Sequence, residues 1–456
     1  MTITDTGPEA APAAAPEPAP SVTSRKARVS WALFDWAQQP YFMMIVGFIF
    51  GPWFAAEFFG DPVQGQATYG FAIALTGLGI AVLSPLIGAA IDARRNPKTW
   101  LAVLAVPFLL GCIGLWFAEP GVLWLAPWIV LAIVASGVAT ELSINTANAM
   151  LPYIAAPGRI GSLSGWSTGL GYFGGLVATV LVLFALPPLL GLDEATGETA
   201  RIAGPVAAIW YAVFILPAFL FVPPPPPSAH VERPLAVLWE TLKSLPRNRT
   251  MLLFLLGRML LGDGANAAGA FGPVLARGLF GWTTIEVGIF GLMLAFLAGV
   301  SCWVSGRFDD RFGSKRTLLA TTALLAFAVC GFGLIEADRL FFFIPVDPPV
   351  AGDGVMFSTA SERLFIAFGV LIAISFGPTG SILRTWMARL TPPGEEGRWF
   401  GLFGLSGRAT SFAAPALIGV LTAAVGDQRV MVPVVLGFLL VAALILLRVP
   451  GNRAAA

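Results

Sequence analysis

The stretch GRFDDRFGSKR at residues 306–316 decides the fold of this 456-residue chain, because a related stretch, GAAIDARRNPK, occurs at residues 88–98. Each is a polar loop between two apolar segments, the second and the third of its half of the chain. Three pairs of landmarks keep one offset of 218 residues: Gly88 and Gly306, Asp92 and Asp310, and Lys98 and Arg316. Two such loops in one register imply an internal duplication, so we expect two halves of the same topology.

The composition predicts a membrane protein. The chain is 57% hydrophobic and 12% charged, with a mean hydropathy of +0.80, whereas a soluble domain carries about 25% charged residues. A net charge of +1 provides no basic field for nucleic acid, so we expect no such partner. Cys112, Cys302 and Cys330 are scattered through apolar stretches and form neither a disulfide framework nor a metal site.

The apolar segments predict the fold class. A membrane-spanning helix needs roughly 20 mostly apolar residues. Twelve segments qualify: 31–58, 68–90, 99–118, 122–150, 161–187, 204–222, 251–279, 285–305, 317–335, 363–388, 399–424 and 430–448. We therefore expect an all-α membrane protein of twelve transmembrane helices, arranged as two six-helix halves related by a pseudo-two-fold axis.

Composition shifts along the chain predict its organisation. The Ala- and Pro-rich start is too poor in apolar residues to fold and indicates a disordered tail. The proline run at residues 223–227 begins a linker, and the spacing of leucines after it indicates a helix on the membrane surface over residues 235–245. The predicted parts are a tail at 1–29, a first half at 30–222, the linker at 223–249, a second half at 250–449, and a short tail at 450–456.

The positive charges predict the orientation. If the N-terminus lies inside, cytoplasmic segments hold 19 of the 27 Lys and Arg residues, external segments hold five, and spans hold three. This asymmetry satisfies the positive-inside rule, so we expect both termini in the cytoplasm. The excess of Arg over Lys and the richness in Ala, Gly and Pro are typical of bacteria, which indicates the inner membrane.

The two loops resemble the signature loop of the major facilitator superfamily. The second copy matches through Gly306, Asp310, Arg311, Gly313, Lys315 and Arg316. The first copy keeps Gly88 and Asp92 but has Ala93 in place of the basic residue, and Arg94, Arg95 and Lys98 supply the charge. The resemblance implies the twelve-helix transporter fold. We expect these loop residues, with Arg94 in the first copy, to gate the cytoplasmic ends of the spans.

A narrower resemblance involves three other stretches: LFDWAQQPY from Leu33, GRMLLGDGANA from Gly257 and RTWMARLTPPGEEGRWFGLFGLSGR from Arg384. They are similar to motifs of the vacuolar autophagy-related efflux permeases and their bacterial relatives. Gln38, Gln39 and Pro40 stand where small polar residues are commoner in that group. The resemblance implies efflux of amino acids from a compartment or from the cell.

Six charges fall inside the predicted spans, namely Asp35, Glu141, Arg258, Asp263, Arg384 and Arg408. Left unpaired at helix centres they would cost on the order of 18 kcal/mol on insertion scales, more than the roughly 5–15 kcal/mol by which a fold is usually stable. We therefore expect ion pairs, such as Asp35 with Arg384 and Glu141 with Arg258, that close the cytoplasmic side of a central cavity. Static contact between helices is the alternative. The three carboxylates are also the expected proton carriers.

Other polar side chains in the spans are candidates for contact with a substrate. They are Gln38, Gln39, Tyr41, Asn145, Asn148, Asn266, Thr379 and Ser381. Asn145 and Asn148 follow Glu141 at helical spacing, so the three share one helix face. Hydrogen bonds between helices are the alternative role for these amides and hydroxyls.

Together these features predict a secondary transporter that moves a small solute by alternating access. No ATP-binding loop of the GxxxxGK[ST] type occurs, so we expect a proton gradient as the driving force and no cofactor. The only histidine, His230, lies in the proline-rich linker and no nucleophile stands with a base, which argues against an enzyme. We expect a monomer in the lipid bilayer. The alternatives are a facilitator or exporter of lipophilic drugs, sugars or lipid head groups, and a scramblase or scaffold that transports nothing.

Overall fold

A computed structural model describes residues 23–94, 96–193, 196–225, 234–348, 356–411 and 413–451. Most of the segment predicted as a tail, residues 1–22, lies outside this range. The first helix begins at Arg25, earlier than the predicted boundary at residue 30, because Ser24 caps it by accepting a hydrogen bond from the Ala27 N–H at 3.1 Å. Residues 25–29 therefore belong to the first span.

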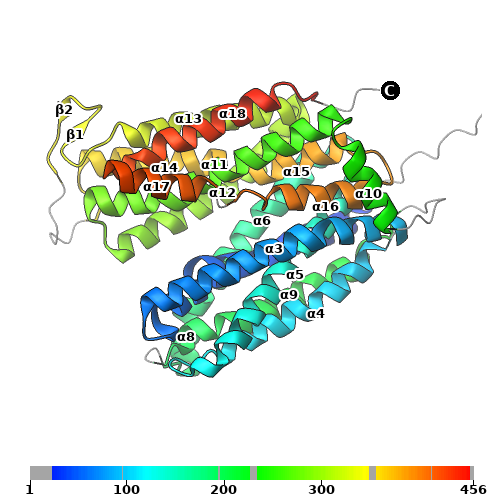
Figure 1. The fold of residues 1–456 in the computed structure, drawn as a ribbon, viewed down its shortest axis with the longest axis horizontal. Helices are drawn as coiled ribbons and strands as arrows, with labels where there is room; N and C mark the ends of the chain where they lie inside the picture. The colour runs from blue at the N-terminus through cyan, green and yellow to red at the C-terminus, as the bar shows by residue number, and fades with distance from the viewer. Residues whose placement is uncertain are drawn as a thin grey trace, which may run out of the picture.

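The first half contains six helical stretches long and apolar enough to span a membrane, and Figure 1 shows how they lie together. Span 1 begins as an α-helix and continues after Pro40 as π-helical and α-helical turns. The elements of this half are α1 (Arg25–Pro40), π-helix Tyr41–Phe48, α2 (Phe50–Trp53), π-helix Phe54–Phe58, α3 (Pro62–Arg94), α4 (Pro97–Gly114), 3-10 turns Leu115–Phe117 and Leu123–Leu125, α5 (Ala126–Ile154), α6 (Ile160–Val180), π-helix Leu181–Ala185, α7 (Leu186–Leu190), α8 (Glu198–Arg201) and α9 (Ala203–Phe221).

The linker contains α10 (Pro234–Ser244), which contacts α3 and confirms the predicted helix. The second half repeats the order of spans and adds a short antiparallel hairpin after its third span. Its elements are α11 (Arg249–Phe280), α12 (Thr284–Phe312), α13 (Ser314–Gly333), β1 (Arg339–Leu340), β2 (Ile344–Pro345), α14 (Ala360–Phe376), α15 (Thr379–Leu390), α16 (Glu396–Ser406), α17 (Ala413–Val425), 3-10 turn Gln428–Val430 and α18 (Met431–Leu446).

Eleven helical stretches of the described chain are long and apolar enough to cross a membrane, and they match eleven of the twelve predicted spans. The predicted span at 399–424 is wrong as a continuous helix, because α16 ends at Ser406 and α17 begins only at Ala413. At the first residue of the break, a Cβ on Gly407 would lie 2.6 Å from the Arg258 guanidinium. Span 11 is thus two short helices joined by turns.

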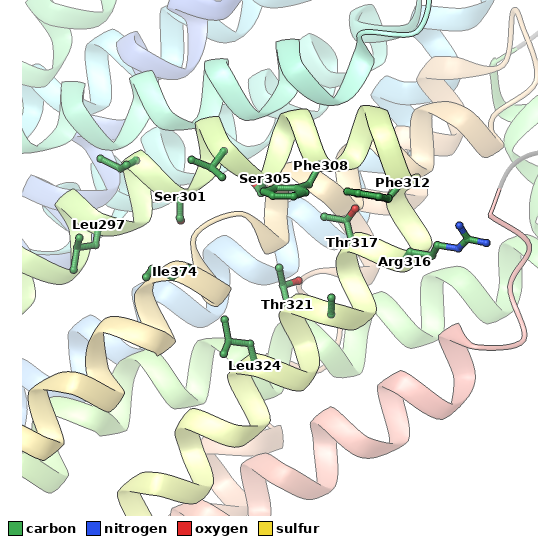
Figure 2. A pocket seen from close by; sticks show the side chains of 13 residues that line it. Leu297, Ser301, Ser305, Phe308, Phe312, Arg316, Thr317, Thr321, Leu324 and Ile374 are labelled. Atoms are coloured by element: carbon green, nitrogen blue, oxygen red, sulfur yellow. The ribbon is translucent and has the colours of Figure 1, made fainter.

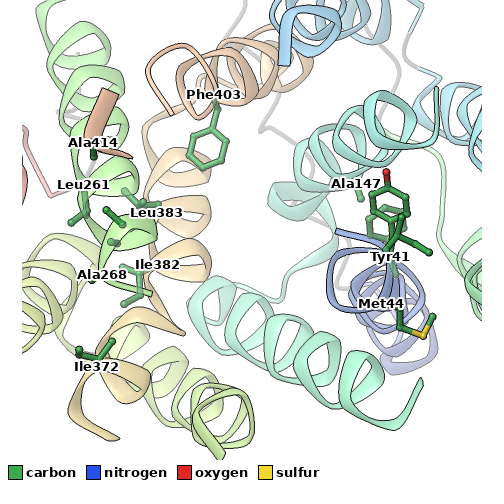
Figure 3. Close-up of a cluster of buried hydrophobic side chains, with 14 of the residues drawn as sticks. Tyr41, Met44, Ala147, Leu261, Ala268, Ile372, Ile382, Leu383, Phe403 and Ala414 are labelled. Carbon is green, nitrogen blue, oxygen red and sulfur yellow. The ribbon is translucent and has the colours of Figure 1, made fainter. Parts of the chain in front are cut away.

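Each half packs as its own bundle of helices. Figure 3 shows Tyr41, Met44 and Ala147 clustered in the first half, apart from Leu261, Leu383 and the other labelled side chains of the second half. Apolar side chains fill both bundles, because each long helix buries one stripe against its neighbours. Contacts between the halves are therefore confined to a few helix pairs.

The most extensive contacts between the halves are made by two helix pairs, α3 with α16 and α6 with α12. Glycines let the backbones meet: a Cβ on Gly88 would lie 2.2 Å from the Gly397 carbonyl oxygen, and one on Gly165 would lie 2.3 Å from the Cys302 carbonyl oxygen. We call these two contacts the seams. In each seam, the second span of one half packs against the fifth span of the other half. The two seams are therefore equivalent under the pseudo-two-fold arrangement.

The seams extend to the end of the molecule that carries the repeated loops, which we call the motif end. In Figure 1 the halves meet there, around α16 and the adjoining end of α3, and diverge toward the far end, which carries α8 and the β1–β2 hairpin. The molecule is thus joined at one end only.

Candidate functional site: charges between the halves

A buried arginine joins the two halves. Arg384 lies on α15, and a guanidinium has five N–H groups to satisfy. Its Nη1 donates to Asp35 Oδ2 at 3.0 Å and to Asn148 Oδ1 at 3.1 Å. Its Nε donates to Ser164 Oγ at 2.9 Å, and its Nη2 donates to Ser164 O at 2.7 Å and to Thr168 Oγ1 at 2.9 Å. All five acceptors belong to the first half. We call Arg384 and the four residues that supply these acceptors, Asp35, Asn148, Ser164 and Thr168, the Arg384 cluster.

The ion pair within the cluster is shielded from water. The side chains of Arg384 and Asp35 are 7% and 16% exposed. Asp35 also accepts a hydrogen bond from Ser167 Oγ at 2.7 Å, and the guanidinium lies 5.3 Å from the centre of the Trp31 ring. Removing one partner of such a buried pair costs about 3–5 kcal/mol, because the other charge stays buried alone. The predicted pairing of Asp35 with Arg384 is confirmed.

A second ion pair crosses between the halves. Arg408 Nη2 contacts Glu141 Oε1, joining the break in span 11 to α5. The predicted pairing of Glu141 with Arg258 is wrong. Arg408, which lies in the break of span 11, takes the Glu141 carboxylate instead, and Arg258 donates to Ser406.

The other two predicted charges, Arg258 and Asp263, contact the residues of the break in span 11 from within the second half. On α11, Arg258 Nη1 donates to Ser406 Oγ at 2.8 Å, and its guanidinium lies 3.5 Å from the centre of the Phe403 ring. The Thr410 hydroxyl donates to Asp263, which is only 3% exposed. All six predicted span charges are therefore partnered, and four of them converge on residues 406–410.

One face of α5 points at the second half, as the spacing of its polar residues predicts. Glu141 meets Arg408, and Asn148 accepts from Arg384. Between them, Asn145 Nδ2 donates at 3.2 Å to Ser84 Oγ, which in turn donates to a carbonyl of α16. The three side chains form a polar stripe along the inner side of the first half.

Three predicted substrate contacts have hydroxyls engaged elsewhere. Tyr41 OH lies 3.2 Å from Ser136 Oγ inside the first half. Thr379 Oγ1 donates to the Ser375 carbonyl at 3.0 Å and Ser381 Oγ to the Pro378 carbonyl at 2.8 Å, each within its own span. These three side chains pack or stabilise local backbone.

The remaining polar candidates have more freedom. Gln38 is 1% exposed, and its amide has no hydrogen-bond partner among the described residues. It follows Asp35 by three residues on α1 and therefore shares its face. Gln39 is half-buried beside Gly175, and Asn266 is exposed on α11. A buried amide without a partner costs about 1–3 kcal/mol, which favours a polar molecule beside Gln38.

The repeated loops hold the seams through their aspartates. Asp92 accepts from the backbone N–H of Gly397 at 2.6 Å and of Arg398 at 2.7 Å, at the start of α16. Asp310 accepts in the same way from the N–H groups of Gly161 at 2.7 Å and Ser162 at 2.8 Å, at the start of α6. A carboxylate stabilises a helix N-terminus through the orphan N–H groups and the dipole.

The basic residues of the second loop do not bridge the halves. Lys315 Nζ donates to the Leu447 carbonyl at 2.7 Å, Arg311 stacks on Phe312, and Arg316 lines an apolar groove. Gly313 ends α12 with φ +85°, a left-handed value that glycine adopts without strain. The Arg94 side chain lies outside the described residues.

Arg389 also belongs to the contact that caps α6, although its sequence context did not predict a role for it. Its Nη1 lies 2.6 Å from Asp309 Oδ1, and its Nη2 lies 3.2 Å from Asp310 Oδ1. Arg389 thus orients the aspartate that caps α6. Arg389 lies five residues after Arg384 on an amphipathic helix, and this position could have suggested a functional role. The sequence alone does not indicate which carboxylates it pairs with.

A further cavity lies outside the charge network. It is an apolar groove of about 660 Å³ between α12, α13 and α14, lined by residues such as Phe308, Phe312 and Leu324 (Figure 2). Over the described ranges, no group of three or more His, Cys, Asp or Glu residues is placed to hold a metal ion. The polar stripe and the two inter-half ion pairs therefore form the candidate site.

The two six-helix halves, the paired loops and the seams define a transporter of the major facilitator superfamily. Residues 55–456 match the family described as "Vacuole effluxer Atg22 like", and the chain belongs to this family. Both resemblances seen in the sequence are confirmed.

Relatives include the uncharacterized MFS-type transporter YxiO of Bacillus subtilis (strain 168), which is 21% identical over 88% of this chain and 90% of its own. Autophagy-related protein 22 of Coccidioides immitis (strain RS) is 26% identical over 59% of this chain and 45% of its own. Autophagy-related protein 22-1 of Aspergillus niger is 24% identical over 63% and 46%. The chain thus spans about half the length of these fungal relatives.

Solved transporters share the fold. The proton:xylose symporter XylE superposes with a TM-score of 0.70 at 14% identity, covering 94% of this chain and 96% of that chain. FucP in its outward conformation gives 0.68 at 13% identity over 92% and 97%. At these identities the likeness shows the fold alone, and fold and family together indicate membrane transport.

Proposed function

We propose that the protein is a secondary active transporter whose motif end is a gate closed by the Arg384 cluster. The observation that carries the proposal is that Arg384, on the second half, is bonded through all five N–H groups to the first half. Separating the halves at this end would strip the guanidinium of every partner. Such an all-or-none contact suits a two-state gate in alternating access.

We place the motif end in the cytoplasm. The distribution of Lys and Arg over the loops supports this orientation through the positive-inside rule. Both described chain ends lie at this end, with Arg25 beginning α1 and Lys315 bonded to the carbonyl of Leu447 after α18. We propose an inner-membrane monomer, closed to the cytoplasm and open outward in this conformation.

Proton coupling is proposed at Asp35, with Glu141 as the second candidate. Protonation of Asp35 would remove the negative charge that faces Arg384 and weaken the cluster. Protonation of Glu141 would do the same to the contact with Arg408. Because both pairs cross between the halves, a change of charge at either one alters the stability of the closed gate, which is how proton binding would couple to the change of conformation.

The substrate class follows from the charges that the gate releases. When the motif end opens, Arg384 and Arg408 lose their carboxylates, and an anionic or zwitterionic solute can replace them. Gln38, one turn from Asp35 and without a hydrogen-bond partner among the described residues, adds a buried amide to the same region. We propose a small amino-acid-like solute, in keeping with the efflux named in the family description. Lipophilic drugs, sugars and lipid head groups are the alternatives.

The test is transport in proteoliposomes that contain the purified full chain. A panel of radiolabelled amino acids, sugars and organic anions is offered with and without an imposed pH gradient, while a dithionite assay follows lipid flipping in the same vesicles. We expect accumulation of an amino-acid-like solute that requires the gradient.

Arg384→Gln should abolish this accumulation, whereas the matched control Arg339→Gln should leave it unchanged. Among the described residues, Arg339 forms an ion pair only with Asp338, and both side chains are 58% exposed. Lipid flipping without movement of any solute would overturn the proposal in favour of a scramblase. Accumulation that ignores the gradient would overturn proton coupling but not transport.

A further inference from the structure

A basic pocket lies at the motif end, beside the α6–α12 seam and apart from the Arg384 cluster. Its volume is about 960 Å³, and it is enclosed by the first turn of α1, the loop between α5 and α6, the start of α6 and the last turns of α12. Four arginines and two tryptophans dominate the lining: Arg25, Arg28, Arg159, Arg307, Trp166 and Trp303. Neither the transport cycle nor the loop motifs use this group of side chains.

The four arginines have no carboxylate partner among the residues that the structure describes. In the described part of the chain, none of them forms an ion pair, and the one polar contact of their head groups is Arg307 Nη1 with the Trp303 carbonyl at 3.1 Å. Asp310 touches the pocket wall at Ser162, but its oxygens are bonded to backbone N–H groups and to Arg389.

Four like charges around one cavity repel each other, and an anion bound among them offsets this repulsion.

The shape of the pocket distinguishes this group of arginines from an ordinary basic surface. Arg25, Arg159 and Arg307 are exposed at its mouth, whereas Arg28 is half-buried. The Trp303 indole donates to the Trp166 carbonyl at 3.3 Å, and these two half-buried side chains form the apolar part of the wall.

The chemistry of this lining selects phosphate. Guanidinium groups bind phosphate oxygens with two parallel N–H donors, a geometry that a lysine cannot offer. Tryptophans and arginines at the ends of spans lie at the depth of lipid head groups, where anionic lipids concentrate positive side chains. We propose that this pocket binds a phosphate-bearing anion, with Arg25, Arg28 and Arg159 on one side and Arg307 on the other.

The position of Arg307 gives the site a consequence for conformation. Arg307 is on the second half, and the other three arginines are on the first half. A phosphate between them therefore links the halves, and the complete site exists only while the α6–α12 seam is closed. A ligand that binds one state shifts the equilibrium toward that state by mass action. The binding does not depend on the proposed function, but this shift does.

The experiment measures binding to the full chain in nanodiscs of phosphatidylcholine. In one arm, phosphatidylglycerol is added in increasing fractions, and bound lipid is counted by native mass spectrometry after release. In the other arm, inorganic pyrophosphate is titrated into lipid-neutral nanodiscs while thermal unfolding is followed. The first arm reports a lipid source of the phosphate, and the second reports a soluble source.

The informative variant is the double substitution Arg159→Gln and Arg307→Gln, which removes one arginine from each half. Its matched control is Arg247→Gln with Arg249→Gln, an equal loss of charge at exposed positions of the same end, outside the pocket. We expect affinity for the responsive phosphate source to fall roughly a hundredfold in the first double, because each of the two lost charged contacts is worth about a factor of ten. The control should stay within about twofold.

Arg307→Lys keeps the charge without the forked donors, so we expect an intermediate affinity. Equal losses in the two doubles would overturn the site in favour of general attraction to anionic surfaces. Absence of saturable binding in both arms would also overturn it. Both doubles are compared only if they unfold at the wild-type temperature in phosphatidylcholine, and Arg307→Lys provides the test if the first double does not.

Discussion

Replacing Asp35 by asparagine should loosen the motif end by a calculable amount. The variant keeps the shape of the side chain and an oxygen acceptor but removes the charge 3.0 Å from Arg384 Nη1. Water screens this pair little, since the two side chains are 16% and 7% exposed. The Arg384 charge would stay buried without its counter-ion, and breaking a buried pair in this way costs about 3–5 kcal/mol. Because the asparagine oxygen can still accept the hydrogen bond, we expect the closed state to lose an amount at the lower end of this range, about 3 kcal/mol.

This loss corresponds to a shift of roughly 100-fold or more in the ratio of closed to open molecules. Pulsed electron spin resonance can measure the ratio from spin labels at Thr99→Cys and Arg448→Cys. Both positions are exposed at the motif end, one on each half. The exposed Cys330 would be replaced by alanine beforehand. We expect the population at the longer distance to grow in Asp35→Asn.

The matched control is Asp338→Asn, which removes the same charge from an exposed pair 3.7 Å apart at the far end. It should leave the distance distribution unchanged. The reasoning would be refuted if Asp35→Asn kept the wild-type distribution while folding normally, or if the control changed it equally. Either result would mean that the ion pair does not contribute to closure.

Three further substitutions test other contacts. Gly165→Val places a side chain within 2.3 Å of a backbone oxygen across the seam, so the same label distances should lengthen, whereas Gly77→Val, with no atom within 4 Å, should not change them. Asp310→Asn removes the charge that caps α6 and should lower the free energy of unfolding by about 1 kcal/mol; an unchanged denaturant midpoint would contradict this. Glu141→Gln should reduce uptake in proteoliposomes by roughly tenfold or more, since the charged contact to Arg408 is lost. A swap to Glu141→Arg with Arg408→Glu should restore part of it, and a swap no better than the single variant would count against the pairing.

The fold was predictable because it depends on properties that accumulate over many residues. Apolar segments long enough to span a bilayer gave eleven spans that the structure confirms. The common offset between Asp92 and Asp310 implied two like halves, and the structure shows both aspartates capping a helix of the opposite half. Helical spacing correctly placed Glu141, Asn145 and Asn148 on one face. Each of these inferences rests on a repeated spacing of residues or on hydrophobicity summed over a long segment.

Which charged residues pair with one another was less predictable, because the pairing depends on where each helix ends. Residues 399–424 are apolar and glycine-rich enough to appear continuous, and only the short run SGRATS at 406–411 indicates the break. Once the chain turns there, Arg408 reaches Glu141, and Arg258 is left with Ser406. The role of Arg389 was not predicted because its carboxylate partners on α12 are distant in the sequence and lie close to it only in the folded chain.

The break in span 11 also bears on how the chain enters the membrane during synthesis. The 13 residues of α17 rise only about 20 Å at 1.5 Å per residue, and the hydrocarbon core is about 30 Å thick. α17 therefore cannot be inserted as a span by itself. The turn at Gly426 and Asp427 joins it directly to the region of α18, so we expect the two to enter as one hairpin, late in translation and against helices already in place. We therefore expect Arg408, in the break before α17, to reach Glu141 of α5 only after α5 is already in the bilayer.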